Sequence, residues 1–180
     1  AHCEGGMRVP FIAAWAKTDV GNPLQQRLPI APGAVQSQLG TVCDLFPTAL
    51  GLIGVPSPAG HVVDGSRLDT LLAGKPDETR EQTFLMHYPH SPHRSNYFTC
   101  YRRGDWKVIY HYFPSKASEG SQYQLYNLAE DPFESQNLAG SHPDQLRLMM
   151  RDLIASLEKH DALYPVDKED GTTPLKPKMP

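Results

Sequence analysis

Apolar residues recur at helical spacing near the C-terminal end of the chain. Their positions are Leu146, Met149, Met150, Leu153, Ile154 and Leu157. This spacing puts them on one side of a helix, and Ser141 and Pro143 suit its first turn. We predict a helix that packs on a core through this face. A partner-binding groove, which a methionine-containing stripe also permits, is the less favoured interpretation.

Two segments before this helix have the pattern of strands, in which successive side chains point to opposite faces. Tyr97–Arg103 and Trp106–Tyr112 flank the dipeptide Gly104-Asp105, a loop suited to the type II′ turn of a hairpin. In the second strand the alternation predicts two faces, Trp106, Val108, Tyr110 and Tyr112 on one and Lys107, Ile109 and His111 on the other. Thr83–Met86 and Gln124–Leu128 predict two further strands, the latter ended by a turn at Asp131-Pro132. The second half is therefore an antiparallel sheet with a closing helix.

The first half has a different pattern. Glu4-Gly5-Gly6 predicts a turn, and the nearly all-apolar run Val9–Trp15 that follows predicts a strand covered on both faces. A strand needs neighbours, so this beginning predicts that further chain precedes it. Residues 17–37 predict a loop, because prolines and glycines interrupt any regular helical or strand spacing of apolar residues.

A helix is expected after this loop. Asp44 suits its N-cap, Pro47 its first turn and Gly54 its C-terminal stop. One face carries Leu45, Ala49, Leu52 and Ile53, and we expect that face to pack on the sheet. A Pro- and Gly-rich link then leads to a turn at residues 64–66 and a short helix that ends at Gly74.

Composition excludes several classes of protein. The 17 prolines and 14 glycines among 180 residues argue for short elements joined by irregular loops. A net charge of −3 gives no case for nucleic-acid binding. No apolar run approaches the roughly 20 residues of a membrane span. Cys3, Cys43 and Cys100 form no CxxC pair, so we expect buried or partly buried thiols rather than a disulfide framework or a metal–thiolate site.

Several segments together resemble the sulfatase family. They are the Glu-Gly-Gly-Met-Arg-Val-Pro run at residues 4–10, Asp-Leu-Phe-Pro-Thr at 44–48, Asp-Gly-Ser at 64–66, Arg-Gly-Asp-Trp-Lys-Val-Ile at 103–109, and Gln-Leu-Tyr-Asn-Leu at 124–128 followed by Asp-Pro-Phe-Glu at 131–134 and Asn-Leu at 137–138. Each is weak alone, but their common order over about residues 4–160 is specific. The resemblance implies an α/β fold: the C-terminal part of an alkaline-phosphatase-like mixed sheet, plus a small subdomain with a four-stranded antiparallel sheet and a C-terminal helix.

The implied domain limits are residues 1–75 for the incomplete end of the large domain, 76–164 for the subdomain and 165–180 for a polar, Pro-rich tail that is disordered or laid over the surface. The family's nucleophile lies in a Cys- or Ser-x-Pro-x-Arg motif, which this chain does not contain. The family's lysine just before Glu-Gly-Gly would precede Ala1, and its calcium ligands, including an Asp-Asn pair, are also absent. We therefore assign no catalytic or metal-binding residue and no cofactor to this chain, while calcium is implied for the complete enzyme.

A histidine-rich stretch follows the first predicted strand of the subdomain. His87, His90 and His93 recur every three residues, but Pro89 and Pro92 exclude a helix that would align them as metal ligands. By resemblance, this loop faces the mouth of the active site, so that His87 and His90 bind the sulfated group or its sugar and Arg94 offers a positive charge. An ordered surface loop with hydrogen-bonded histidines is an equally good interpretation.

The expected function is thus that of a C-terminal sulfatase fragment, a sulfuric ester hydrolase only together with a missing N-terminal catalytic portion. Its expected substrate is a sulfated small molecule or sugar. A stand-alone binding module on the same scaffold is the alternative, and a phosphatase or phosphodiesterase relative would need metal ligands that are absent. The resemblance implies a periplasmic, secreted or lysosomal location, which no residue here shows.

Overall fold

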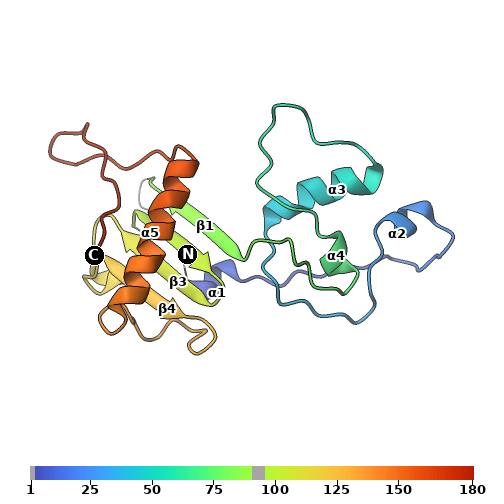
Figure 1. Ribbon diagram of the computed structural model, residues 1–180, viewed down its shortest axis with the longest axis horizontal. Helices are drawn as coiled ribbons and strands as arrows, with labels where there is room; N and C mark the ends of the chain where they lie inside the picture. Colours follow the sequence, from blue (N-terminus) through green and yellow to red (C-terminus); the bar gives the residue numbers. More distant parts are fainter. Residues whose placement is uncertain (1–2, 91–95) are drawn as a thin grey trace. The chain divides into compact units, whose positions relative to one another are not determined.

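The computed structural model describes residues 3–90 and 96–180 (Figure 1). The chain forms two compact units. The first contains the N-terminal residues as far as Val9 together with Thr83–Pro180, and the second contains Pro10–Gln82. The N-terminal segment therefore packs with the antiparallel sheet that follows much later in the chain, and the C-terminal tail belongs to the same unit. Both differ from the domain limits expected from the sequence.

The first unit is built on a four-stranded antiparallel sheet in the order β1-β2-β3-β4. The strands are β1 (Thr83–Tyr88), β2 (Phe98–Arg103), β3 (Trp106–His111) and β4 (Tyr123–Asn127). The predicted hairpin is confirmed, with Arg103 opposite Trp106 in the register. Gly104 has a φ of 57°, the positive value that the first position of a type II′ turn requires.

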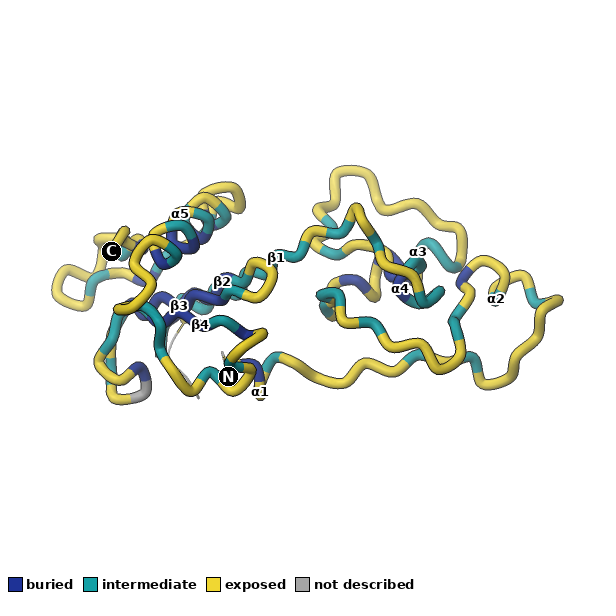
Figure 2. The backbone as a smooth tube through the Cα atoms, turned by 60° about the horizontal axis from the view of Figure 1, so that its bottom comes forward, coloured by how far each residue is buried: buried dark blue, intermediate teal, exposed yellow. Residues whose placement is uncertain are grey.

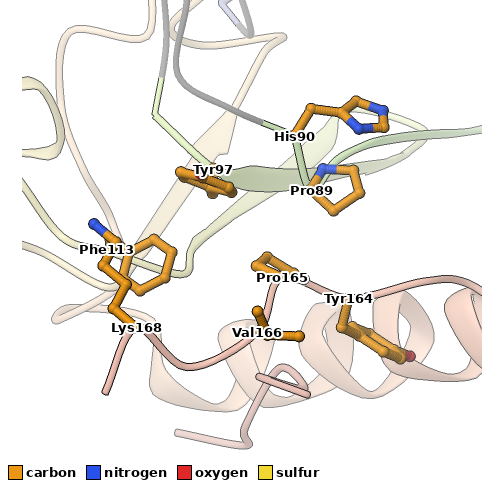
Figure 3. A pocket seen from close by; sticks show the side chains of 8 residues that line it. All are labelled: Pro89, His90, Tyr97, Phe113, Tyr164, Pro165, Val166 and Lys168. Carbon is orange, nitrogen blue, oxygen red and sulfur yellow. The ribbon is translucent and has the colours of Figure 1, made fainter. Parts of the chain in front are cut away.

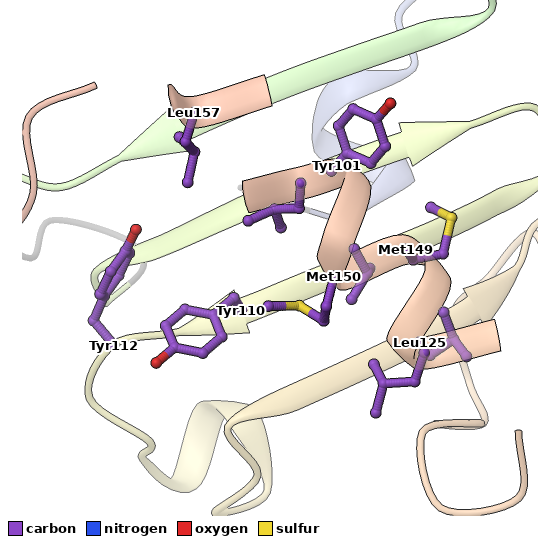
Figure 4. Close-up of a cluster of buried hydrophobic side chains, with 10 residues drawn as sticks. Tyr101, Tyr110, Tyr112, Leu125, Met149, Met150 and Leu157 are labelled. Carbon is purple, nitrogen blue, oxygen red and sulfur yellow. The ribbon is translucent and has the colours of Figure 1, made fainter. Parts of the chain in front are cut away.

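Helix α5 (Pro143–Lys159) covers one face of this sheet (Figure 1). The predicted helical face is confirmed, because Met150, Leu153 and Leu157 are completely buried. They meet a core formed by Val108, Tyr110 and Tyr112, which alternation assigned to this face, together with Tyr101 and Leu125 of the neighbouring strands (Figure 4). A buried side chain of this size contributes about 1.5–3 kcal/mol, so this interface accounts for much of the unit's stability.

The opposite face of the sheet carries a second, smaller core. Its buried members are Phe98, Cys100, Ile109, Tyr126 and Leu128. The N-terminal segment contributes here: Glu-Gly-Gly-Met, predicted as a turn, forms the single helical turn α1 (Glu4–Met7), and Met7 packs on this cluster. The predicted alternation in β3 is thus confirmed on both faces, and it places Lys107 on the side of α1.

The second unit has short helices joined by long loops. They are α2 (Pro23–Arg27), the 3₁₀ turn η1 (Val42–Asp44), α3 (Leu45–Ile53) and α4 (Asp69–Leu72). The predicted helix after residue 44 and its stop are confirmed, since Gly54 adopts the left-handed conformation with a φ of 74°. A capping box between Thr41 and Asp44 begins the helical segment one turn earlier than predicted.

Buried Asp44 organises this unit. Its carboxylate accepts hydrogen bonds from the backbone nitrogens of Thr41 at 2.7 Å and Ser66 at 2.8 Å. It also pairs with the Arg80 guanidinium at 2.9 Å, and both side chains are almost fully buried. The second Arg80 nitrogen donates to the carbonyls of Ser66 and Arg67. One buried charge pair therefore joins α3, the Asp-Gly-Ser turn and the end of the unit.

The prediction of a strand at Val9–Trp15 is wrong. Residues 9–15 form no strand, and Val9, Phe11 and Ile12 are 71%, 59% and 90% exposed. A strand requires a neighbour to pair with its backbone groups, and no strand among the described residues pairs with this run. The α3 face expected to pack on the large sheet is mostly exposed, with Ile53 at 59%, and the described residues contain no sheet besides β1-β2-β3-β4. Figure 2 shows how much of this unit is exposed.

The tail after α5 lies over the first unit rather than being disordered. Val166 forms a β-bridge with Pro174, and the Tyr123 hydroxyl donates to the carbonyl of Lys178 at 3.1 Å. The remaining element is the 3₁₀ turn η2 (Lys116–Ser118) between β3 and β4. Among the helices of the described residues, none combines the length and apolarity needed to cross a membrane.

Candidate functional site

A hollow of about 430 Å³ lies beside the histidine-rich stretch (Figure 3). Its walls are formed by Pro89, His90, Tyr97, Phe113, Tyr164, Pro165, Val166 and Lys168. The first two residues follow β1, Tyr97 precedes β2, Phe113 follows β3, and the others come from the tail. The ends of three adjacent strands thus supply one side of the hollow, and the tail supplies the other.

Aromatic contacts fix the side chains at one end. The rings of Tyr97 and Phe113 meet edge to face with their centroids 5.0 Å apart. The Lys168 ammonium sits over the Phe113 ring, 4.3 Å from its centroid, in a cation–π contact. His90 lies at the other end of the hollow (Figure 3) and is exposed. The hollow therefore has an apolar middle and a cationic or titratable group at each end.

His87 is half-buried, its ring meets that of the wall residue Tyr164 with centroids 5.9 Å apart, and both of its ring nitrogens form hydrogen bonds. Nε2 lies 2.6 Å from the carbonyl oxygen of Leu163, and Nδ1 lies 2.7 Å from the Thr99 hydroxyl. Because a carbonyl only accepts, Nε2 carries the proton in the neutral ring, and Nδ1 accepts from Thr99. The Thr99 oxygen in turn accepts from the Tyr112 hydroxyl at 2.9 Å, whose pKa burial raises.

These bonds make His87 a clasp between β1, β2 and the tail. Burial lowers the pKa of His87, opposed by its hydrogen bond to Leu163, so the ring is neutral at pH 7. With both nitrogens engaged inside the chain, His87 acts on the hollow by holding the tail in place. His90 instead meets the Tyr88 ring edge to face, with the ring centroids 5.5 Å apart. Arg94, the third predicted site residue, lies outside the described residues.

A metal site is not formed by this arrangement. Within residues 3–90 and 96–180, no three His, Cys, Asp or Glu side chains come together as a metal-binding group. The described residues therefore do not fit the calcium ion that the resemblance implies, and we derive no step through that ion. The three cysteines are free, and Cys3 and Cys43 are exposed rather than buried as expected.

A buried cluster of charges, which the sequence did not predict, lies on the α1 side of the sheet. The Lys107 ammonium, whose side chain has no exposed surface, lies 2.7 Å from a Glu134 carboxylate oxygen and 3.1 Å from one of Glu4. Burial lowers the pKa of Lys107, but Cys100 and the two carboxylates raise it more strongly, so the pKa lies above its ordinary value. Glu4, which the sequence suggested was a simple turn residue, is a buried ion-pair partner.

Further contacts tie this cluster to α1. The backbone nitrogen of Glu4 donates to the other Glu134 oxygen at 2.5 Å, and Arg102 lies 3.5 Å from the second Glu4 oxygen. The cluster thus joins the Glu-Gly-Gly, Gly-Asp-Trp-Lys and Asp-Pro-Phe-Glu segments, which are far apart in the sequence. A lysine at an inward position of an alternating strand was the signal available, because a buried lysine needs carboxylate partners.

Comparisons with known proteins agree with the sulfatase resemblance of these segments. The family model described as N-sulphoglucosamine sulphohydrolase, C-terminal, matches residues 4–161. An uncharacterized sulfatase of Schizosaccharomyces pombe is 31% identical over 153 residues, which cover 79% of this chain and 24% of that protein. Mouse N-acetylgalactosamine-6-sulfatase is 44% identical over 73 residues, which cover 40% of this chain and 12% of the enzyme.

A solved structure shares the fold. It is a complex of a protein with its substrate D-glucosamine-2-N,6-O-disulfate, and it matches with a TM-score of 0.60 at 23% identity, covering 73% of this chain and 26% of that one. The chain therefore spans about a quarter or less of the length of the relatives that it matches.

Proposed function

Because this chain belongs to the sulfatase family, matching its C-terminal domain over residues 4–161, we propose that it acts as the C-terminal part of a sulfuric ester hydrolase. In this proposal the nucleophile and the calcium ligands reside in an N-terminal catalytic portion, and this chain supplies scaffold and the rim of the substrate pocket. The observation that carries the proposal is that one family match spans both compact units.

Two of the similar proteins support a substrate class for this proposal. Mouse N-acetylgalactosamine-6-sulfatase is named for a sulfated amino sugar, and the structure that shares the fold holds a sulfated glucosamine. We propose that the complete enzyme acts on a sulfated saccharide. His90, exposed at one end of the hollow, would contact the substrate directly, and His87 would position the tail. The binding role of Arg94 rests on the sequence resemblance.

The alternative of a stand-alone binding module is not favoured. Val9, Ile12, Val42 and Phe46 are among the large apolar side chains of which 47% or more is exposed. Exposed apolar surface on this scale marks a region that another part of a protein covers. An N-terminal portion of the same enzyme is the natural occupant, since the chain spans only 24% of the first relative.

The test compares the chain with its longer parent protein. The purified 180-residue chain should release no sulfate from 4-nitrocatechol sulfate, whereas the parent that includes the upstream reading frame should. Release of sulfate by the chain alone would contradict the proposal that the catalytic residues reside in the N-terminal portion. The upstream frame should also encode Cys- or Ser-x-Pro-x-Arg, and a parent without that motif would contradict the proposed hydrolase.

A further inference from the structure

We propose that the tail, residues 162–180, is an acid-released strap: a proton taken up by His87 loosens it from the strand ends and opens the hollow. This device goes beyond the proposed function, because it concerns when the tail lies in place and not which substrate is bound. The tail supplies one whole side of the hollow (Figure 3). It also lies outside residues 4–161, which the family model matches.

The tail can move as one piece. The Asp167 nitrogen donates to the carbonyl of Thr173, and the Leu175 nitrogen donates to the carbonyl of Pro165, both at 2.8 Å. These bonds lie within the tail, so they survive when it leaves the sheet. The side chain of Leu163, next to the clasp, is 82% exposed and adds little apolar contact to hold it down.

Polar contacts fasten the tail to the sheet at two points. His87 holds the carbonyl of Leu163 at 2.6 Å, and the Tyr123 hydroxyl holds that of Lys178 at 3.1 Å. Of these two side chains, histidine is the one that changes its charge near neutral pH. The clasp at His87 is therefore the point at which pH acts on the tail.

The hydrogen bonds of the clasp fit a neutral ring and not a protonated one. While Nε2 of His87 donates to Leu163, Nδ1 accepts from the Thr99 hydroxyl, whose oxygen accepts from Tyr112. A protonated ring donates through both nitrogens, so the Thr99 hydrogen has to turn away from Nδ1. One of the two hydroxyl hydrogens then loses its acceptor within this chain of bonds. Thr99 has no exposed surface, so the loss is costly.

Nearby positive charge also opposes a proton on His87. His90, which follows the same strand, lowers the pKa of His87. Lys176 of the tail lies 5.7 Å from the ring centroid of Tyr164, and that ring lies 5.9 Å from the ring of His87. Strands β2 and β3 face His87 with the two hydroxyls already described.

The carboxylates on this side of the unit interact with other groups. Burial and the Glu158 carboxylate of α5 raise the pKa of Tyr164. In the tail, Asp167 and Asp170 accept hydrogen bonds from the backbone of its own turn. Among the described residues no carboxylate forms an ion pair with His87, so none stabilises its charged form there.

The direction of the pH effect follows from these contacts. Burial lowers the pKa of His87, the bond to Leu163 raises it and His90 lowers it, so the pKa lies below its ordinary value of about 6.5 while the tail is in place. Once the tail lifts, the ring can turn into water and regain its ordinary pKa. The closed tail is therefore fully favoured above about pH 6.5. Below it the closed tail loses up to about tenfold in population ratio per pH unit, as far as the lowered pKa.

The experiment measures the lifted population of the tail in the 180-residue chain at pH 7.5 and pH 5.5. Exchange-saturation NMR on methyl groups detects such a minor state. Leu163 and Leu175 report on the tail, whereas Leu125 and Leu153 of the core report on unfolding of the whole unit.

His87→Gln is the test variant. Its amide nitrogen can donate to Leu163 and its amide oxygen can accept from Thr99, as the neutral ring does, but the amide takes up no proton. His90→Gln is the matched control, because it removes an exposed histidine near the same strand end and leaves the clasp intact.

We expect the lifted population to rise about three- to tenfold from pH 7.5 to pH 5.5 in the original chain and in His90→Gln, with unchanged core signals. In His87→Gln it should change by less than about twofold. A lifted population that does not depend on pH in the original chain would overturn the proposal, as would an equal rise in His87→Gln. A rise that is matched by the core signals would also overturn it, since the whole unit would then be unfolding.

Discussion

The buried charge cluster gives the sharpest test of how the first unit is held together. Replacing Lys107 by Met keeps most of the side chain's length and removes its charge. The side chains of Glu4 and Glu134 are only 9% and 2% exposed. Their carboxylates would therefore stay buried without the ammonium, which lies 3.1 Å from Glu4 and 2.7 Å from Glu134. The unit would then carry uncompensated negative charge in its interior.

The expected cost follows from that geometry. Removing one partner of a buried ion pair destabilises a protein by about 3–5 kcal/mol. Arg102 still lies 3.5 Å from Glu4 and is 25% exposed, so it compensates part of that charge, and we expect a loss of about 3 kcal/mol in the free energy of unfolding. Since domains are stable by about 5–15 kcal/mol, such a loss is large.

The measurement is urea unfolding followed by Trp106 fluorescence, in a Trp15→Phe background so that only the first unit reports. Lys116→Met, at an exposed position of the same unit, is the control and should change stability by no more than about 0.5 kcal/mol. Adding Glu134→Gln to Lys107→Met should restore at least about 1 kcal/mol, because it removes one uncompensated charge.

Two results would refute this reasoning. One is a loss of less than about 1 kcal/mol for Lys107→Met, which would mean that water or Arg102 compensates the carboxylates fully. The other is a double variant no more stable than Lys107→Met, which would mean that the lysine acts through its volume and not its charge.

Two further predictions concern the clasp and the second unit. His87 has a lowered pKa in the folded chain, so below its ordinary value of about 6.5 the unfolded chain takes up the proton more readily and stability falls as the pH drops. His87→Phe should weaken this pH dependence of the free energy of unfolding between pH 7.5 and 5.5, measured by urea unfolding, while His111, whose pKa burial also lowers, keeps part of it. An unchanged pH dependence would contradict the clasp. Gly65→Ala would place a Cβ 2.1 Å from the Cys43 carbonyl oxygen, so it should destabilise the second unit by about 1–3 kcal/mol, as followed by Trp15 fluorescence. Gly40→Ala, whose Cβ finds ordinary contacts at 3.6 Å or more, should not. Equal stability of the two variants would show that the turn does not approach η1 as closely as described.

Helix α5 and the four strands could be predicted from the sequence because their signals are local. Leu146, Met150 and Leu157 lie at helical spacing, and the alternation in Trp106–Tyr112 assigned each side chain to the correct face. Gly54 and Gly104 marked a helix end and a turn because few other residues adopt their positive φ. In each case the neighbours in sequence decide the structure.

The run Val9–Trp15 shows the limit of that reasoning. Its apolar residues predict a strand, but strand formation depends on hydrogen bonds to a second strand, which the described residues do not provide for it. The candidate site shows the same limit. His87 and His90 could be identified by residue type, whereas the hollow beside them exists only because the tail lies over the strand ends.

Helix α5, the four strands and the family of the chain follow from the sequence alone, since periodicity, turn residues and the order of motifs are local properties. The fold in three dimensions is needed to see that Glu4 pairs with Lys107 across 103 positions of sequence and that Lys168 meets Phe113. A buried charge needs a partner, but its identity depends on which distant segments the fold brings together, because pairing acts through distance in space and not along the chain.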